Sequence, residues 1–126
     1  MLDEIIISID AMGGDNAPEV VIKGIDYFLK HEGKNRNAKF LLHGNKDKLS
    51  KLLKKSNLTS NCSVILHTEK FIEMDAKPSH ALRRGKGSSM WNSIESVKDN
   101  VANVAVSAGN TGALMAMSKL QLRMKP

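Results

Sequence analysis

Four apolar runs of strand length alternate with helical patterns along the chain. The runs cover residues 4–10, 38–43, 63–67 and 101–107, and the first is rich in β-branched isoleucine. A loop or turn follows each run, and a helical pattern follows each loop. Strand, loop and helix repeated four times predict an α/β layer fold with a mostly parallel sheet.

The predicted helices have recognisable start and stop signals. Pro18 suits the first turn of the first helix, and Gly33 ends its pattern. Asn45 is a candidate cap of the second helix, and Ser88 or Ser89 of the fourth. The predicted helices cover residues 18–32, 45–55, 79–84, 88–100 and 113–124.

Apolar side chains at helical spacing are the expected core positions of three of these helices. They are Val21, Ile25, Phe28 and Leu29 in the first helix, Leu49, Leu52 and Leu53 in the second, and Leu114, Met117 and Leu120 or neighbours in the last.

The loops that follow the strands are expected along one edge of the sheet, because the crossovers of parallel strands are right-handed. Open α/β sheets bind their ligands there, beyond the carboxyl ends of the strands. This edge is predicted to hold residues 10–15, 43–44, 67–68 and 107–112.

The richest candidate chemistry is in residues 107–112 (SAGNTG), between the last strand and the last helix. Backbone N–H groups at such a turn converge on an anion, and Asn110 and Thr111 add side-chain donors. Gly109 and Gly112 allow a ligand to approach closely, although a tight turn would need the same glycines without a ligand. The spacing leaves both interpretations open, and it is not the GxGxxG dinucleotide fingerprint.

Asp10 and Asp15 are two carboxylates in the loop that follows the first strand, and Gly13 and Gly14 lie between them. The carboxylates could position a metal, a base or a cationic partner. Alternatively, Asp10 caps its own loop and Asp15 or Asn16 caps the next helix. Capping is the favoured interpretation for Asp15, and less so for Asp10.

Two basic segments have both a functional and a structural interpretation. Residues 83–89 (RRGKGSS) suit a phosphate but do not match the Walker pattern, and a solvated turn is the alternative. The lysines of the second helix form a solvated face or a docking patch for an acidic partner or an anionic surface. These lysines are Lys46, Lys48, Lys51, Lys54 and Lys55.

Composition narrows the function classes. The chain has 126 residues and a formal net charge of +6, with 41% apolar and 25% charged residues, which is typical of a globular domain. Aromatic residues make up 4%, too few for a base-stacking surface, so we expect no nucleic-acid partner. The single cysteine, the absence of an apolar run of membrane-spanning length and the lack of a signal-peptide pattern indicate a cytoplasmic protein. The four histidines show no metal-ligand spacing, so we expect no metal site.

Several long motifs occur in the order found in one bacterial enzyme family. They are residues 9–19 (IDAMGGDNAPE), 74–78 (MDAKP), 81–84 (ALRR), 88–90 (SSM) and 106–116 (VSAGNTGALMA). The chain resembles the N-terminal part of the phosphate acyltransferases (PlsX), and the resemblance covers essentially its whole length. The family is related in fold to the isocitrate and isopropylmalate dehydrogenases, which implies a three-layer α/β sandwich.

The resemblance implies transfer of a fatty acyl group from acyl carrier protein to inorganic phosphate, giving acyl phosphate for phospholipid synthesis. It also implies acyl carrier protein and phosphate as partners, a homodimer, and peripheral association with the inner face of the membrane. Phosphate carries its own nucleophilic charge, so the implied reaction requires no covalent enzyme nucleophile and no cofactor. The enzyme needs to position two anions and stabilise an oxyanion. The implied catalytic residues are Asn110 and Arg84, and the implied phosphate-binding residues are Arg83, Ser107, Gly109, Thr111 and Gly112, with Asp10, Gly13 and Gly14 forming the opposite wall.

Two departures from the family pattern change the expectation. Gly85 and Gly87 stand where the family tends to have charged residues, which loosens the basic loop. Family members are also much longer, so we expect residues 1–126 to be the N-terminal part of a truncated domain with little activity alone. The alternatives are a non-catalytic gene remnant and an independent basic module that binds acyl carrier protein or an anionic membrane.

Overall fold

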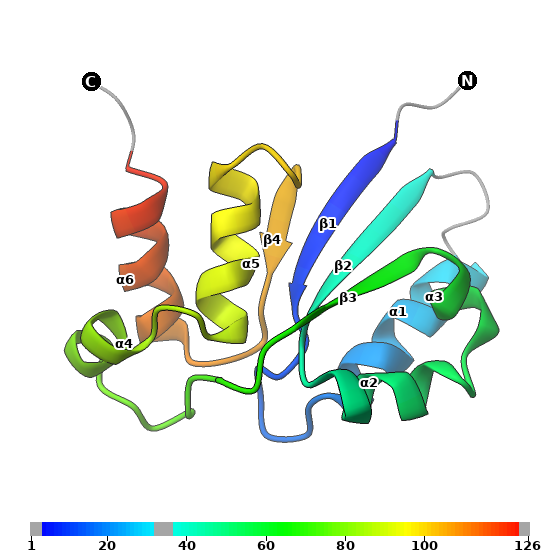
Figure 1. Cartoon of the computed structure of the whole chain (residues 1–126), viewed down its shortest axis with the longest axis horizontal. Coiled ribbons are helices and arrows are strands. Elements are labelled where there is room, and N and C mark those ends of the chain that lie inside the picture. The colour runs from blue at the N-terminus through cyan, green and yellow to red at the C-terminus, as the bar shows by residue number, and fades with distance from the viewer. Residues whose placement is uncertain (1–3, 32–36, 124–126) are drawn as a thin grey trace.

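The computed structural model describes residues 4–31 and 37–123. Four parallel strands form one sheet in the order β3-β2-β1-β4, which confirms the predicted α/β architecture (Figure 1). The strands are β1 (Ile5–Asp10), β2 (Ala38–Gly44), β3 (Ser63–His67) and β4 (Val104–Val106). The helices are α1 (Glu19–His31), α2 (Lys46–Leu53), α3 (Asn57–Asn61), α4 (Pro78–Arg84), α5 (Ser89–Lys98) and α6 (Thr111–Gln121).

Alternation along β1 separates the two faces of the sheet. Ile9 belongs to a core cluster with Phe40 and Leu42 of β2 and the apolar faces of α1 and α2. Its neighbour Asp10 points to the other face, where it contacts Ser89 of α5. Because successive side chains of a strand point to opposite faces, α1 and α2 cover one face and α5 covers the other, giving three layers.

A second core cluster joins α4, α5 and α6. It contains Met90 and Ile94 of α5, Ala81 of α4, and Ala113 and Met117 of α6. The helix α6 therefore packs on α4 and α5, outside the layer that touches the sheet.

The apolar face of α6 is rotated from its predicted position. Met117 is buried as predicted, but Leu120 is 47% exposed and Gln121 is buried in its place. The reason is that the Gln121 amide Nε2 donates to the Trp91 carbonyl at 3.1 Å, so a polar side chain faces α5. The spacing of apolar residues alone does not predict that a polar side chain such as Gln121 is buried.

In the described part of the chain, three helices begin with a side-chain capping hydrogen bond, and two of these caps were predicted from the sequence. The Asn45 side chain accepts from the amide of Lys48, and that of Ser88 accepts from the amide of Trp91. Asn110 caps α6 through the amide of Ala113, whereas the sequence suggested it as a ligand donor.

The elements differ from prediction most clearly at β4 and α3. β4 covers three residues instead of the predicted 101–107, because Val101 and Ala102 donate backwards to the carbonyl of Ser96. The short helix α3 was not predicted, and its five residues are too few to show a period. The predicted stop at Gly33 and the predicted end of the last helix at residue 124 lie outside the described residues. Among the described helices, none has the length and apolar character needed to cross a membrane.

Candidate functional site

The two glycine loops meet at the carboxyl edge of the sheet, at the bottom of Figure 1. A Cβ atom added to Gly13 would lie 3.0 Å from the amide nitrogen of Gly109, and one added to Gly109 would lie 3.3 Å from the Cα of Gly13. Gly14 adopts a positive φ of 103° beside the Ala108 carbonyl. The loops after β1 and β4 therefore pack backbone against backbone, a contact that leaves no room for larger side chains.

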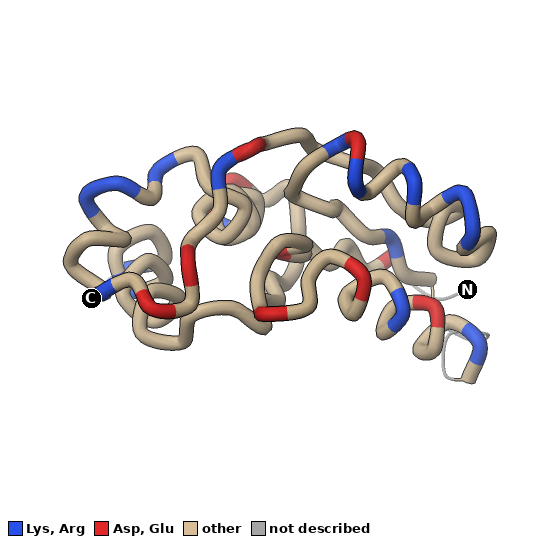
Figure 2. The backbone as a smooth tube through the Cα atoms, turned by 90° about the horizontal axis from the view of Figure 1, so that it is seen from below, with Lys and Arg blue, Asp and Glu red and all other residues tan. Residues whose placement is uncertain are grey.

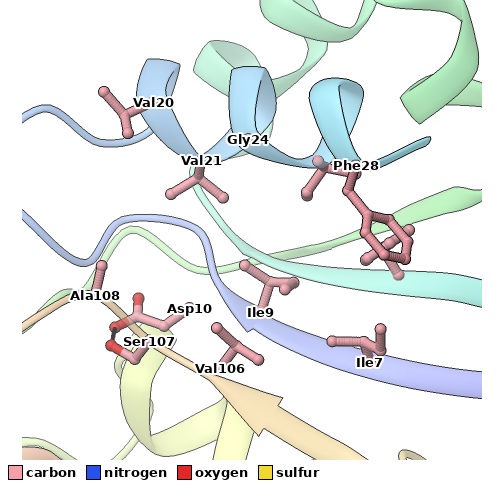
Figure 3. A pocket seen from close by; sticks show the side chains of 12 residues that line it. Ile7, Ile9, Asp10, Val20, Val21, Gly24, Phe28, Val106, Ser107 and Ala108 are labelled. Atoms are coloured by element: carbon pink, nitrogen blue, oxygen red, sulfur yellow. Dashed lines mark hydrogen bonds between the residues drawn. The ribbon is translucent and has the colours of Figure 1, made fainter. Parts of the chain in front are cut away.

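The Asp10 carboxylate ties the loop after β4 to the start of α5. Its side chain is 2% exposed. Its Oδ1 accepts from the Ser89 hydroxyl at 2.6 Å. Its Oδ2 accepts from the Ser107 hydroxyl at 2.8 Å, as Figure 3 shows. The Ser107 oxygen in turn accepts from the amide of Gly109 at 3.0 Å. One buried carboxylate thus fixes the geometry of the loop that begins at Ser107.

Burial governs the ionisation of this carboxyl. Desolvation raises the pKa of Asp10 above its ordinary value, against the opposing effect of hydrogen bonds from Ser89, Ser107 and the amides of Met12 and Gly13. Both carboxylate oxygens are engaged by hydroxyl donors. This arrangement makes Asp10 a residue that positions Ser107, whereas the sequence left metal binding, base chemistry and capping all open.

Ser89 contacts Asp10, whereas the sequence suggested it as a cap of α5. Ser88 and Ser89 were both candidate caps of α5, and Ser88 is the one that caps it. Ser89 is fully buried and turns to Asp10 instead. The signal was available in the sequence, since two adjacent serines cannot both cap one helix.

Asn110 fixes a second segment against the start of α6. Its Nδ2 donates to the carbonyls of Glu73 and Ala76, at 3.1 and 2.7 Å, while its Oδ1 accepts from Ala113. The side chain, implied to be catalytic, is 6% exposed and holds the 73–76 segment. Its catalytic role stays a prediction.

The first turn of α6 offers the donors expected of an anion site. The first intrahelical bond runs from Leu114 to the Asn110 carbonyl, so the amides of Thr111 and Gly112 lack intrahelical acceptors. Both residues are exposed, and the positive end of the helix dipole lies at this turn. A Cβ at Gly112 would lie 2.9 Å from Pro78, which keeps the start of α4 close to the turn.

Arg83 and Arg84 lie at the other end of α4 and are exposed. Arg84 lines a cleft of about 290 Å³ together with Lys70, His80 and the acidic Glu73. Lys70 also donates to the Lys86 carbonyl at 3.0 Å. The phosphate-binding roles of the two arginines stay predictions.

The ends of β2 and β3 form a separate polar region of the same edge. His43 pairs in register with Leu66, and its Nε2 lies 3.1 Å from the Ser96 hydroxyl. The His67 Nδ1 accepts from the amide of Lys46. Burial lowers the pKa of His43 to about 4. Within the described residues, no group of three or more His, Cys, Asp or Glu is arranged to hold a metal ion.

Basic residues lie along one side of this edge when it is viewed from below (Figure 2). The five lysines in and directly after α2 are all exposed, which both a solvated face and a docking patch require; they are Lys46, Lys48, Lys51, Lys54 and Lys55. Lys70, Arg83, Arg84 and Lys86 are also exposed, and the two arginines lie in the last turn of α4. A solvated face and a docking surface are both compatible with this distribution.

Comparison with known proteins places the chain in a family. The family model described as "Fatty acid synthesis protein" matches residues 5–126. The chain is 49% identical over 124 residues to the phosphate acyltransferase of Caulobacter vibrioides, covering 98% of this chain and 34% of that protein. It is 50% identical over 119 residues to that of Maricaulis maris and 48% over 118 residues to that of Jannaschia sp., covering 94% of this chain in each case.

The chain spans about a third of the length of the curated relatives that it matches. The motifs on which the resemblance rested include both glycine loops, the 74–78 segment held by Asn110, and the serine pair at the start of α5. The relatives that it matches are named phosphate acyltransferase. Because the family model matches residues 5–126, the chain belongs to the fatty acid synthesis protein family.

Proposed function

We propose that this chain supplies the phosphate-binding portion of an acyltransferase that moves a fatty acyl group from acyl carrier protein to inorganic phosphate. The observation that carries the proposal is the pair of glycine loops held together by Asp10 and Ser107 beside the first turn of α6. The naming of the relatives as phosphate acyltransferases supports the same assignment.

The phosphate is assigned to the first turn of α6. There the amides of Thr111 and Gly112 donate to phosphate oxygens, and the helix dipole favours the negative charge. Asp10 acts at a distance from the anion, because its oxygens are occupied by the hydroxyls of Ser89 and Ser107. A buried carboxylate close to a phosphate would repel it, so its function is to position the loop.

The chemical step needs no covalent enzyme intermediate. A phosphate oxygen attacks the thioester carbonyl, a C–O bond forms, and the C–S bond breaks as the oxyanion collapses. The thiolate of the carrier leaves and takes up the proton that the attacking phosphate loses, so that acyl phosphate and the free carrier thiol are the products. The protein lowers the barrier by aligning the two anions and by stabilising the charge on the carbonyl oxygen. The guanidinium of Arg84 has five N–H groups and is the proposed donor to both the phosphate and the carbonyl oxygen. The Asn110 side chain, whose two amide hydrogens are engaged by Glu73 and Ala76, positions the turn between them.

The rest of the site is assigned to polypeptide outside this chain. The chain spans about a third of its relatives, and the sites of open α/β sheets are assembled from several loops. We therefore expect little activity from these 126 residues alone. By resemblance to the family, the complete enzyme is proposed to be a homodimer. The exposed lysines of α2 suit an acidic carrier protein and an anionic membrane surface, so the enzyme would work in the cytoplasm, in part at the inner face of the membrane.

A chimera tests the proposal. Residues of this chain replace the matched 124 residues of the Caulobacter vibrioides relative, and acyl phosphate is trapped with hydroxylamine and measured. The chimera is expected to form acyl phosphate from acyl carrier protein in a phosphate-dependent reaction. A folded chimera that forms none would contradict the assignment of function to this chain.

Arg84→Ala in that chimera is expected to raise the KM for phosphate about tenfold or more. Removal of one charge-assisted hydrogen bond costs about 1.5–3 kcal/mol, and about 1.4 kcal/mol corresponds to a factor of ten. Lys98→Ala, which removes an exposed charge at the far end of α5, is the matched control. An unchanged KM in Arg84→Ala would remove the arginine from the phosphate site.

A basic binding module is the alternative function, and the exposed lysines of α2 are the observation that favours it. It predicts salt-sensitive binding of acyl carrier protein by the chain alone. An inactive chimera combined with such binding would favour the module over the enzyme.

A further inference from the structure

The segment that leads into α4 is fixed against the start of α6 at two points. The Asn110 amide donates to the Ala76 carbonyl at 2.7 Å. Two residues later, Pro78 packs against Gly112, because a Cβ atom added to that glycine would lie 2.9 Å from the Pro78 Cγ. Lys77 is the residue between these two points, so its backbone is held beside the first turn of α6.

Lys77 combines this fixed backbone with a side chain that has no structural contact to make. Its backbone is extended at the residue before α4, with φ −70° and ψ 142°, and its carbonyl accepts from the amide of Ala81. The side chain is exposed and makes no capping hydrogen bond. Among the described residues, the only ion pair joins Lys30 and Asp26, so no carboxylate engages the Lys77 ammonium.

The charges of this segment require a cation if an anion is to bind next to it. Between residues 71 and 79 the charged side chains are Glu73, Asp75 and Lys77, and all three are exposed. The two carboxylates repel phosphate, and Lys77 is the basic residue of this stretch that offsets them. A lysine ammonium is a compact point charge with three N–H donors on a flexible stem, which suits a phosphate oxygen.

The two arginines of α4 approach the same turn from farther away. The helix α4 packs alongside α6 (Figure 1). Pro78 begins α4, whereas Arg83 and Arg84 lie in its last turn. At a rise of 1.5 Å per residue, Arg84 lies about 9 Å farther along the helix axis than Pro78. A long guanidinium side chain bridges part of this distance, but Lys77 starts beside the turn.

We propose that Lys77 contacts the phosphate bound at the first turn of α6. Its ammonium and the amides of Thr111 and Gly112 donate to the same anion. Asn110 and Pro78 are positioning residues for Lys77, because they hold the backbone on either side of it. The inference rests on the proposed function, since it adds a residue to the phosphate site assigned there.

Phosphate binding by the chain itself tests the inference without reference to catalysis. The isotope-labelled chain is titrated with inorganic phosphate at constant ionic strength, and the dissociation constant is taken from the amide shifts of Thr111 and Gly112. Lys77→Ala is expected to weaken binding about fivefold. The loss is smaller than for a buried charge, because water screens an exposed ammonium.

Two controls separate phosphate contact from a general loss of charge and from misfolding. Lys119→Ala removes the same charge from the last turn of α6, at the opposite end of the helix, and is expected to leave the phosphate affinity unchanged. Urea unfolding followed by circular dichroism is expected to be the same for Lys77→Ala as for the parent, because the side chain is exposed and caps nothing.

Kinetics of the chimera with the Caulobacter vibrioides relative separate the two anionic substrates. Lys77→Ala is expected to raise the KM for phosphate about fivefold, in line with the binding loss, and to leave the KM for acyl carrier protein unchanged. An exposed lysine that docks the acidic carrier would give the reverse result.

Three results would overturn the inference. These are an unchanged phosphate affinity in Lys77→Ala, an equal loss in Lys119→Ala, and a raised KM for the carrier protein alone. If the parent chain shows no saturable shift at Thr111 and Gly112, the phosphate site is wrong and the inference is wrong with it. A folded chimera that forms no acyl phosphate, while Lys77→Ala still weakens phosphate binding by the chain, would instead count against the proposed function alone.

Discussion

Gly13→Ala is expected to destabilise the chain by about 1–3 kcal/mol, the usual cost of forcing an extra methyl group into a packed site. The added methyl would lie 2.5 Å from Asp10 Oδ2 and 3.0 Å from the amide nitrogen of Gly109. Either the carboxylate gives up its bond with Ser107 or the two glycine loops separate. The midpoint of urea unfolding, followed by circular dichroism, measures the effect.

Gly24→Ala is the matched control, because the same methyl group meets nothing within 4 Å on α1. It is expected to stabilise the free chain by about 0.5–1 kcal/mol through helix propensity and a less flexible unfolded state. The two substitutions therefore shift the midpoint in opposite directions. Shifts of the same sign and size would show that the contact between the glycine loops contributes nothing to stability.

Mild acid is expected to destabilise the fold through His43. Its side chain is 3% exposed, and burial lowers its pKa from 6.5 to about 4. Between these values the unfolded chain binds a proton that the folded chain does not, so the free energy of unfolding falls as the pH falls from 6.5 to about 4. A gap of this size corresponds to about 3 kcal/mol in full.

His43→Gln isolates this contribution from that of Asp10. Burial raises the pKa of Asp10, so its contribution changes in the opposite direction and stability falls as the pH rises through that pKa. Both proteins contain Asp10, and the difference between their unfolding free energies leaves out its effect. That difference is expected to shrink by about 2 kcal/mol between about pH 7 and pH 5. Parallel pH profiles would mean that His43 titrates alike in both states.

The sheet and its ligand-binding edge were predictable because they follow from local pattern and handedness. Strand-length runs before glycine loops predicted that residues 10–15 and 107–112 would lie on one edge, and Gly13 indeed packs against Gly109. Parallel topology required no knowledge of side-chain contacts, only the order of the elements and the right-handed crossover.

The contacts that organise the site were less predictable, because they join residues far apart in sequence. Ser89 and Asp10 are separated by 79 positions and Ser107 and Asp10 by 97. Asn110 illustrates the same limit, because its amide is engaged by carbonyls of the 73–76 segment, 34 and 37 positions away. Residue type predicted hydrogen-bond donors and acceptors at this edge, but only the fold determines the pairs that form.

The family match agrees with two features of the structure. Two glycine loops form one wall of a site, and an apolar surface over β4 continues beyond the helices of this chain. The loops are held by hydrogen bonds within the described residues, so they do not need the missing contacts to keep their shape. The turn proposed to bind phosphate is therefore held by contacts within the described residues.

The most direct measurement is a titration of the isotope-labelled chain with inorganic phosphate, followed by amide NMR at constant ionic strength. Saturable shifts are expected at the amides of Gly109, Thr111 and Gly112, together with Gly13, and chloride alone is expected to cause none of them. Shifts confined to the lysines of α2, or no saturable change in the loop that begins at Ser107, would contradict the assignment of the phosphate site.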